Sequence, residues 1–160
     1  MMNPHAFQFS NGGGCYALHI WLEKNFVRQV GSLGNIFLPV GSYLYLGNAR
    51  GTGGLRARIS RHCRSDKRIH WHVDHLTSWG RVLHVWTRAQ GSECNLREVF
   101  MQNLAIQPAV KGFGSTNCNI CPSHLLAMPS LDSSGICENI TETLEISGVD
   151  FMFYELASVS

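Results

Sequence analysis

The chain of 160 residues has few charged side chains and no long apolar run. Asp, Glu, Lys and Arg make up 15% of the residues and hydrophobic side chains 44%, a balance that excludes a disordered chain. No stretch approaches the roughly 18 apolar residues that a membrane span needs. The first 14 residues also lack the basic start and apolar core of a signal peptide. We therefore expect a globular protein of the cytoplasm, or of the nucleus in a eukaryote, whose thiols stay reduced.

Acidic residues are scarce in most of the chain, and basic residues are absent from its last part. Residues 1–126 hold all 13 Lys and Arg but five of the 11 acidic residues, whereas residues 127–160 hold the other six. Seven basic residues lie close together: Arg50, Arg56, Arg58, Arg61, Arg64, Lys67 and Arg68. Such a segment is typical of proteins that bind nucleic-acid phosphates, although a solvated helix face can be equally basic.

The length predicts one main domain, and composition divides the chain at residue 126. We assign residues 1–126 to this domain, with a Cys- and His-containing loop at 112–126. Residues 127–160 form an acidic C-terminal extension, of which 127–149, rich in Ser, Thr, Asp and Glu, are interpreted as a linker or loose segment. The extension could fold over the basic segment and inhibit it, or it could be a solvated appendage.

Hydrophobic patterning predicts both strands and helices along the chain. Alternating or short apolar runs predict strands at 15–22, 26–30, 43–46, 81–88 and 151–156. Helical periodicity predicts helices at 55–63 and 70–79, and a third that starts after the N-cap Ser92 and reaches about residue 106.

The helix predicted at 55–63 has a polar edge beside its core stripe. Leu55, Ile59 and Cys63 form the stripe, and Arg58 and His62 lie four residues apart along its edge. Side chains in such a position can reach into a neighbouring cleft. The alternative for Arg58 is a surface arginine that covers apolar area.

The helix after Ser92 carries two glutamates with different orientations. Leu96, Phe100 and Leu104 define its buried side; Glu93 projects close to that side and Glu98 nearly opposite. A carboxylate directed toward a core is costly unless it meets a cation or donors, so Glu93 is a candidate for a metal or substrate site. A Glu in the first turn also favours the helix dipole without any ligand. Glu98 is the expected solvent-facing residue.

Two further clusters contain histidine. The segment from Cys118 to His124 offers a Cys-x2-Cys-x2-His pattern through Cys121, and Cys94 could complete a tetrahedral zinc site. Buried free thiols, a reversible disulfide and a Cys/His hydrolase are the alternatives.

The second cluster contains His70, His72 and Asp74. These residues could ligate a metal, or they could form a structural network that supports a nearby site. On a helix His70 and Asp74 would be four residues apart and could bond each other.

Four short motifs, taken in order, resemble the GIY-YIG nuclease superfamily. They are Gly14-Cys15-Tyr16, Tyr45-Leu46-Gly47, Arg58 on the next helix and Glu93 on a later helix. The chain is most similar to an uncharacterised branch sometimes fused to endonuclease III-type DNA glycosylases. The matching stretches are PVGSYLYLGNARGTGGLRARISRH, KRIHWHVDHL, SECNL and GFGSTNCNICPSHL, and they cover roughly residues 14–126.

This resemblance implies a fold and an activity. The implied fold is α/β (α+β), with a small mixed, mainly antiparallel central sheet flanked by helices. The implied activity is divalent-metal-dependent endonuclease hydrolysis of DNA phosphodiester bonds, in DNA repair, with DNA and a repair glycosylase as expected partners and no membrane. A non-catalytic nucleic-acid-binding module on the same fold, stabilised by zinc, is the alternative.

The resemblance also assigns roles to residues. Glu93 would hold Mg²⁺ or Mn²⁺, Arg58 would grip the scissile phosphate, and Tyr16 would act as general base or orient the attacking water. Tyr45 would line the site and His62 could relay a proton. The neighbouring cations would contact the substrate: Arg50, Arg56, Arg61 and Lys67.

Two departures from the superfamily pattern stand out. Tyr16 and Tyr45 are 29 residues apart, which is longer than usual, and the extra residues are expected to form a hairpin strand and loop at 26–41. Asn48 stands where many members carry Lys, Ser or Thr, and Arg50 could replace such a lysine.

Overall fold

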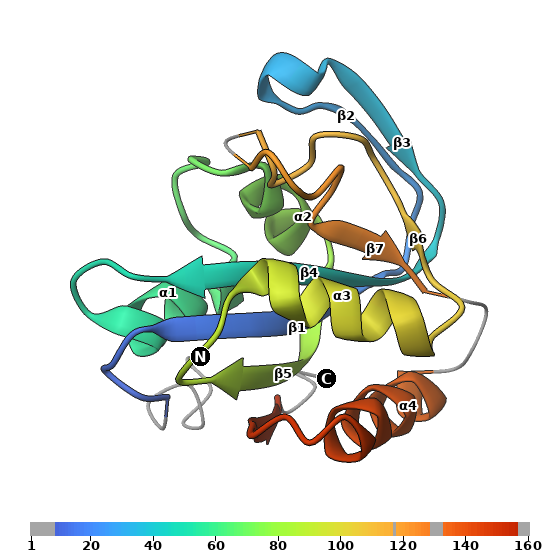
Figure 1. Cartoon of the computed structure of the whole chain (residues 1–160). Helices are drawn as coiled ribbons and strands as arrows, with labels where there is room; N and C mark the ends of the chain where they lie inside the picture. The colour runs from blue at the N-terminus through green and yellow to red at the C-terminus, as the bar shows by residue number, and fades with distance from the viewer. Residues whose placement is uncertain (1–8, 117, 129–132, 157–160) are drawn as a thin grey trace.

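The computed structural model describes residues 9–116, 118–128 and 133–156, and its centre is a six-stranded sheet (Figure 1). The strands follow the order β6-β7-β4-β1-β5-β8, and each neighbouring pair is antiparallel. Their bounds are β1 Gly14–Leu22, β4 Gly41–Ala49, β5 Arg81–Arg88, β6 Gln107–Pro108, β7 Leu125–Ala127 and β8 Met152–Glu155. The predicted α/β (α+β) class with a mainly antiparallel central sheet is confirmed.

Helices cover both faces of this sheet. One face carries α1 (Gly54–Cys63), α2 (His72–Trp79) and a hairpin; the other carries α3 (Glu93–Asn103) and α4 (Ser133–Ile146). The hairpin consists of β2 (Phe26–Gln29) and β3 (Asn35–Leu38), joined through the short 3-10 turn η2 (Gly31–Leu33). It confirms the expectation that the extra residues between the two tyrosine motifs form a hairpin. None of the helices among the described residues is long and apolar enough to cross a bilayer.

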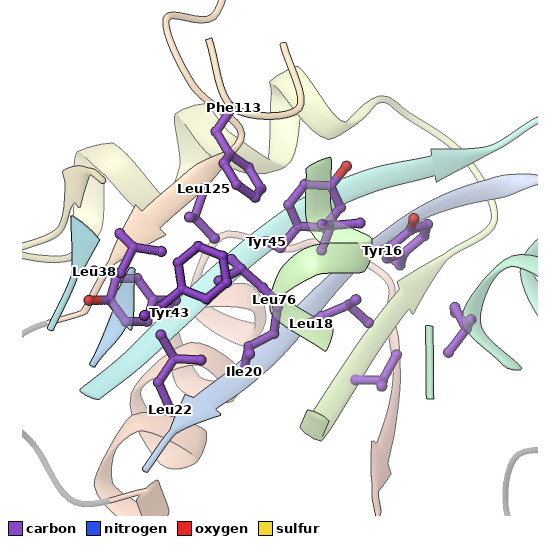
Figure 2. Packing of buried hydrophobic residues seen from close by; sticks show 14 of the residues in the cluster. Tyr16, Leu18, Ile20, Leu22, Leu38, Tyr43, Tyr45, Leu76, Phe113 and Leu125 are labelled. Atoms are coloured by element: carbon purple, nitrogen blue, oxygen red, sulfur yellow. The ribbon is translucent and has the colours of Figure 1, made fainter. Parts of the chain in front are cut away.

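The alternation of side chains in β1 builds the two cores. Tyr16, Leu18 and Ile20 face α1 and α2, whereas Cys15 and Ala17 face α3 and α4. Figure 2 shows Leu18, Ile20 and Leu22 following Tyr16 along the strand. Because β1 is central and buried on both faces, it holds Tyr16 on a rigid support.

Gly47 of β4 lies directly across from Tyr16 of β1. A Cβ atom at position 47 would lie 2.5 Å from the Tyr16 ring and hydroxyl, much closer than packed atoms approach. The glycine of the Tyr45-Leu46-Gly47 motif therefore leaves space for the Tyr16 side chain, which explains physically why the two motifs occur together.

The interpretation of residues 127–149 as a linker or loose segment is wrong. Residues 133–146 form α4, which buries Ile136, Ile140 and Leu144 against the sheet and α3. The spacing of these three residues is helical, but the surrounding Ser, Thr and Glu residues obscured it. Since α4 lies on the face opposite α1, this helix of the acidic extension does not cover the basic segment (Figure 1).

Several predicted boundaries also need correction. The second helix begins at His72 rather than residue 70. The backbone N–H groups of His70 and Trp71, which precede the helix, donate to the Asp74 side chain instead of continuing the helix. The third helix ends at Asn103, and β4 extends well beyond the predicted residues 43–46. The last strand, predicted at 151–156, is β8. Ser92 caps α3 as predicted, since its Oγ accepts from the Asn95 N–H at 3.1 Å.

Candidate active site and thiol cluster

One pocket of about 460 Å³ brings together all five residues to which the nuclease resemblance gives a catalytic role. Tyr16 enters it from β1, Tyr45 from β4, Arg58 and His62 from α1, and Glu93 from the first turn of α3. These residues are spread over 77 positions of the sequence, so the fold itself creates their proximity.

Tyr16 and His62 form a buried hydrogen-bonded pair. The Tyr16 hydroxyl oxygen lies 2.7 Å from His62 Nε2, and both residues are 1% exposed. Burial, followed by the nearby cation of Lys67, lowers the pKa of His62 to about 3, so its imidazole is neutral at neutral pH. Burial also raises the pKa of Tyr16 well above its usual value, although Arg58 opposes the shift. Tyr16 is therefore a protonated phenol, and only proton transfer to a neighbour would turn it into a base.

Tyr45 forms a wall of the pocket. Its ring meets Phe113 and His62 edge-on, with centroids 6.3 Å and 6.4 Å away. Gly114 passes so close that a Cβ there would lie 2.8 Å from the Tyr45 ring. Burial raises the pKa of Tyr45, which keeps its hydroxyl protonated. This placement agrees with the predicted role of Tyr45 in lining the site.

Arg58 is held over an aromatic ring at the pocket wall. Its Cζ atom lies 4.1 Å from the centroid of the Trp71 ring, a cation–π distance. The contact limits the guanidinium's motion, and Arg58 also hydrogen-bonds to the Tyr16 side chain while lining the pocket. Trp71 was not predicted to belong to the site; its position in the sequence between His70 and His72, which also line the pocket, was the available signal.

The four other cations predicted to contact substrate divide into two pairs. Arg61 donates to Asp74 and to the Arg68 carbonyl, each at 2.7 Å. Lys67 Nζ donates to Thr77 Oγ1 at 2.6 Å and to two carbonyls at the end of α1. The side chains of Arg61 and Lys67 are therefore engaged in hydrogen bonds that hold α1 and α2 together. Arg50 and Arg56 lie outside the residues that line the pocket, and their contact with substrate stays a prediction.

Glu93 has one occupied and one open carboxylate oxygen. Oε1 accepts a hydrogen bond from Asn48 Nδ2 at 2.7 Å. Oε2 is buried and has no hydrogen-bond partner among the described residues. A buried carboxylate oxygen without a donor is costly, so Glu93 fits a cation in the pocket. Asn48 differs from the residues common at this position in GIY-YIG nucleases, and its hydrogen bond orients the Glu93 carboxylate. Glu98, as predicted, is exposed, and it accepts a hydrogen bond from Gln102.

Cys94, Cys118, Cys121 and His124 form a group, called the thiol cluster below, that could hold a metal ion, as the sequence predicted. Their ligand atoms all lie within 4.8 Å of one another, and all three cysteines are free thiols. Cys94 Sγ is 3.5 Å from Cys118 Sγ and 3.8 Å from His124 Nε2. His124 Nδ1 lies 3.1 Å from the Gly114 carbonyl, and donation to it would leave Nε2 free as a ligand. Backbone N–H groups of Cys121 and Ile120 lower the pKa of Cys118, which favours its thiolate.

His70, His72 and Asp74 take part in hydrogen bonds and do not belong to the group of described residues that could hold a metal ion. The backbone N–H of His70, not its side chain, donates to Asp74 Oδ2 at 2.8 Å. His72 Nδ1 accepts from the Gly114 N–H at 3.0 Å and so ties α2 to the loop that carries the thiols. These hydrogen bonds connect α1 to α2, and α2 to Gly114, beside the pocket.

The comparison with protein families gives one result. The model of a domain of unknown function, DUF123, matches residues 15–146. The chain belongs to the DUF123 family. The DUF123 match runs from β1 through α4 and contains every residue of the pocket and of the thiol cluster. No curated protein and no solved structure matches the chain.

Proposed function

We propose that this DUF123 chain is a divalent-metal-dependent endonuclease that hydrolyses phosphodiester bonds in DNA, with an active site like that of GIY-YIG nucleases. The observation that supports this is the meeting of Tyr16, Tyr45, Arg58, His62 and Glu93 in one pocket. The four motifs that resemble the superfamily are far apart in sequence, and a chance resemblance would not require them to converge.

The residue types suit this reaction. A phosphodiester is negatively charged, so its hydrolysis requires neutralisation of charge and an activated water. Arg58, held against Trp71, presents donors to a phosphate. Glu93 Oε2 is open to Mg²⁺ or Mn²⁺, which when bound would neutralise charge on the phosphate and acidify a bound water.

The distribution of charge favours a polyanionic substrate on the α1 side. The basic segment from Arg50 to Arg68 includes α1, whereas α4, with Glu138, Glu142 and Glu145, covers the opposite face of the sheet. DNA approaching α1 would meet attraction and little repulsion. The proposal includes a role in DNA repair, beside a repair glycosylase, in the cytoplasm or nucleus.

We further propose that the thiol cluster holds Zn²⁺. Three thiolates and one imidazole are a common tetrahedral ligand set for zinc. The ion would tie Cys94 of α3 to the loop at 118–124 and keep the neighbouring Glu93 in place. Elemental analysis should find about one zinc per chain. Cys118→Ser should lose it, whereas Cys63→Ser, at a thiol outside the cluster, should retain it. Equal zinc content in the two variants would refute the site.

A non-catalytic nucleic-acid-binding module is the second candidate. It is favoured by the 1% exposure of Tyr16 and by the Asn48 contact to Glu93, which both restrict the groups that chemistry would need. Such a module would bind DNA in a salt-dependent manner and leave every strand intact in Mg²⁺ or Mn²⁺.

Cleavage of labelled duplex, single-stranded and branched DNA with Mg²⁺ or Mn²⁺ tests the proposal. We expect metal-dependent cleavage that falls at least about 100-fold in Glu93→Gln and in Arg58→Ala. Matched controls are Glu98→Gln on the exposed face of α3 and Arg81→Ala at the exposed start of β5, outside the basic segment, which should retain activity. Binding without cleavage by the native chain would favour the second candidate.

A further inference from the structure

We infer that Asp74 is a positioning residue that fixes the tautomer of His62, so that His62 accepts the proton of Tyr16 during hydrolysis. The inference rests on the proposed nuclease function and adds to it the origin of the base. It is carried by a buried chain of three side chains, from Asp74 on α2 through His62 on α1 to Tyr16 on β1.

One carboxylate oxygen of Asp74 is saturated with hydrogen bonds, and the other lies near His62. Oδ2 accepts from Arg61 at 2.7 Å and from the N–H groups of His70 and Trp71 at 2.8 and 2.9 Å. Oδ1 is buried, has no hydrogen-bond partner among the described residues, and lies 3.9 Å from His62 Nδ1. The three donors on Oδ2 hold the carboxylate in this orientation.

His62 has the complementary arrangement. Its Nδ1 atom is buried and likewise lacks a hydrogen-bond partner within the described chain. A neutral imidazole carries one hydrogen, on either nitrogen. With the hydrogen on Nδ1, the ring presents a positive edge to Asp74 Oδ1; with it on Nε2, the Nδ1 lone pair would face the carboxylate. Asp74 therefore favours the Nδ1–H tautomer.

This tautomer determines the direction of the bond to Tyr16. Nε2 then carries the lone pair, so the Tyr16 hydroxyl donates to it across 2.7 Å. Donation in this direction makes Tyr16 ready to lose its proton. The opposite tautomer would donate into the Tyr16 oxygen and block the transfer.

The reaction step then balances as follows. The attacking water's oxygen forms a bond to phosphorus while one of its protons moves to the Tyr16 oxygen and the Tyr16 proton moves to His62 Nε2. The bond between phosphorus and the leaving sugar oxygen breaks with its electron pair, and that oxygen takes a proton from solvent. The imidazolium, favoured by the substrate's negative charge and by Asp74, returns its extra proton to solvent.

The experiment uses Asp74→Asn, with Asp66→Asn as the control that removes the same charge at an exposed position of the preceding loop. The asparagine can offer its oxygen to the three donors and its amide group to His62 Nδ1, which would reverse the tautomer. Nitrogen-15 NMR of histidine-labelled protein reads the tautomer directly, with His62 assigned by the signals missing in His62→Gln. DNA cleavage and DNA affinity are measured on the same samples.

We expect the native chain and Asp66→Asn to show protonated Nδ1 on His62 and equal cleavage rates. Asp74→Asn should show protonated Nε2 and a cleavage rate lower by at least about 100-fold, at unchanged DNA affinity. Protonated Nε2 in the native chain overturns the inference even if the variant fails to fold. Cleavage by a folded Asp74→Asn chain at the native rate also overturns it and leaves the nuclease proposal standing. A native chain that cleaves no DNA overturns both.

Discussion

Gly47 lies against the Tyr16 ring in the pocket. A Cβ atom at this position would lie 2.5 to 2.9 Å from three ring and hydroxyl atoms of a side chain that is 1% exposed. Tyr16 is fixed by its bond to His62, so it has no free space into which to move. The position of Tyr16 in the pocket therefore requires that residue 47 be a glycine, which has no side chain.

Gly47→Ala should therefore destabilise the protein by about 1–3 kcal/mol, because it overpacks a filled core. It should also break the bond between Tyr16 and His62. Urea unfolding measures the loss, and Gly51→Ala is the control, since a Cβ there meets nothing within 4 Å. Equal stability of the two variants would show that Tyr16 can move aside.

The pH dependence of stability follows from buried histidines. His19 and His84 lie in the core with their Nδ1 atoms 2.9 Å apart, and His19 Nε2 is 2.8 Å from Ser42 Oγ. Burial, together with the neighbouring His84, lowers the pKa of His19 to about 3 in the folded chain. In the unfolded chain its pKa returns to about 6.5. Below that value the unfolded state binds more protons than the folded state.

The contribution of these histidines to the free energy of unfolding should consequently be constant above about pH 7 and should fall as the pH decreases from about 6.5 toward 3. Between pH 7.5 and pH 5, His19 and His62 should each contribute a loss of about 2 kcal/mol. Urea unfolding at the two pH values measures this difference, and His19→Gln should reduce it. A difference that is the same in His19→Gln would show that other groups cause it.

At the scale of elements, α4 shows how a helix can be stabilised by three residues in a polar sequence. Ile136 and Ile140 are 0% exposed and Leu144 is 1% exposed, whereas Ile146, on the same helix, is 74% exposed. The helix completes the second core, although its composition resembles that of a linker.

Ile140→Ala should destabilise the protein by about 2–5 kcal/mol, because it leaves a cavity between α4 and the sheet. Ile146→Ala removes the same atoms at an exposed position and should change stability by less than about 0.5 kcal/mol. Thermal unfolding of both variants makes the comparison. Equal melting temperatures would mean that α4 contributes little to the core.

The same contrast explains what the sequence could predict. The strands at 15–22 and 81–88 have strong alternation, and the helix at 55–63 has a clear stripe with Arg58 and His62 at its edge; all three elements were found as expected. Pattern failed at α4, where polar residues outnumber the buried ones, and at the start of α2, where a side-chain cap at Asp74 sets the first residue. Periodicity carries no information on such caps.

The site shows a similar division. The sequence motifs predicted that Tyr16, Tyr45, Arg58, His62 and Glu93 share one site, and these residues line one pocket. The Cys-x2-Cys-x2-His pattern, with Cys94 as the candidate fourth ligand, predicted the thiol cluster. The contacts that occupy Arg61 and Lys67, and the ring of Trp71 under Arg58, arise from tertiary packing. Charge and spacing along the chain cannot distinguish a cation that is free for substrate from one already bound.

At the scale of the whole molecule, charge is separated by the sheet. The basic segment includes α1 on one face, and the helix α4 on the other contains acidic residues but no Lys or Arg. A polyanion would therefore orient the molecule before any specific contact forms.

Arg64→Ala, on the α1 side, should weaken DNA binding about tenfold at 0.1 M salt and lower the slope of log affinity against log salt by about 1. Ile146→Glu changes the net charge by the same amount on the opposite side, at a position that is 74% exposed, and should leave affinity within about twofold. Fluorescence anisotropy at several salt concentrations distinguishes the two. Equal weakening would mean that only total charge matters.

The adjacency of Glu93 and Cys94 at the start of α3 limits how this protein can change length. Glu93 lines the pocket and bonds to Asn48, whereas Cys94 belongs to the thiol cluster and contacts Cys118. Asn48 and Cys118 lie in separate segments of the chain. A helix turns by about 100° per residue, so one residue inserted between the two would rotate one of them away from its partner. Substitutions on the solvent side of this turn should be tolerated, but insertions and deletions should not. The two sites must therefore keep their spacing through evolution as one unit.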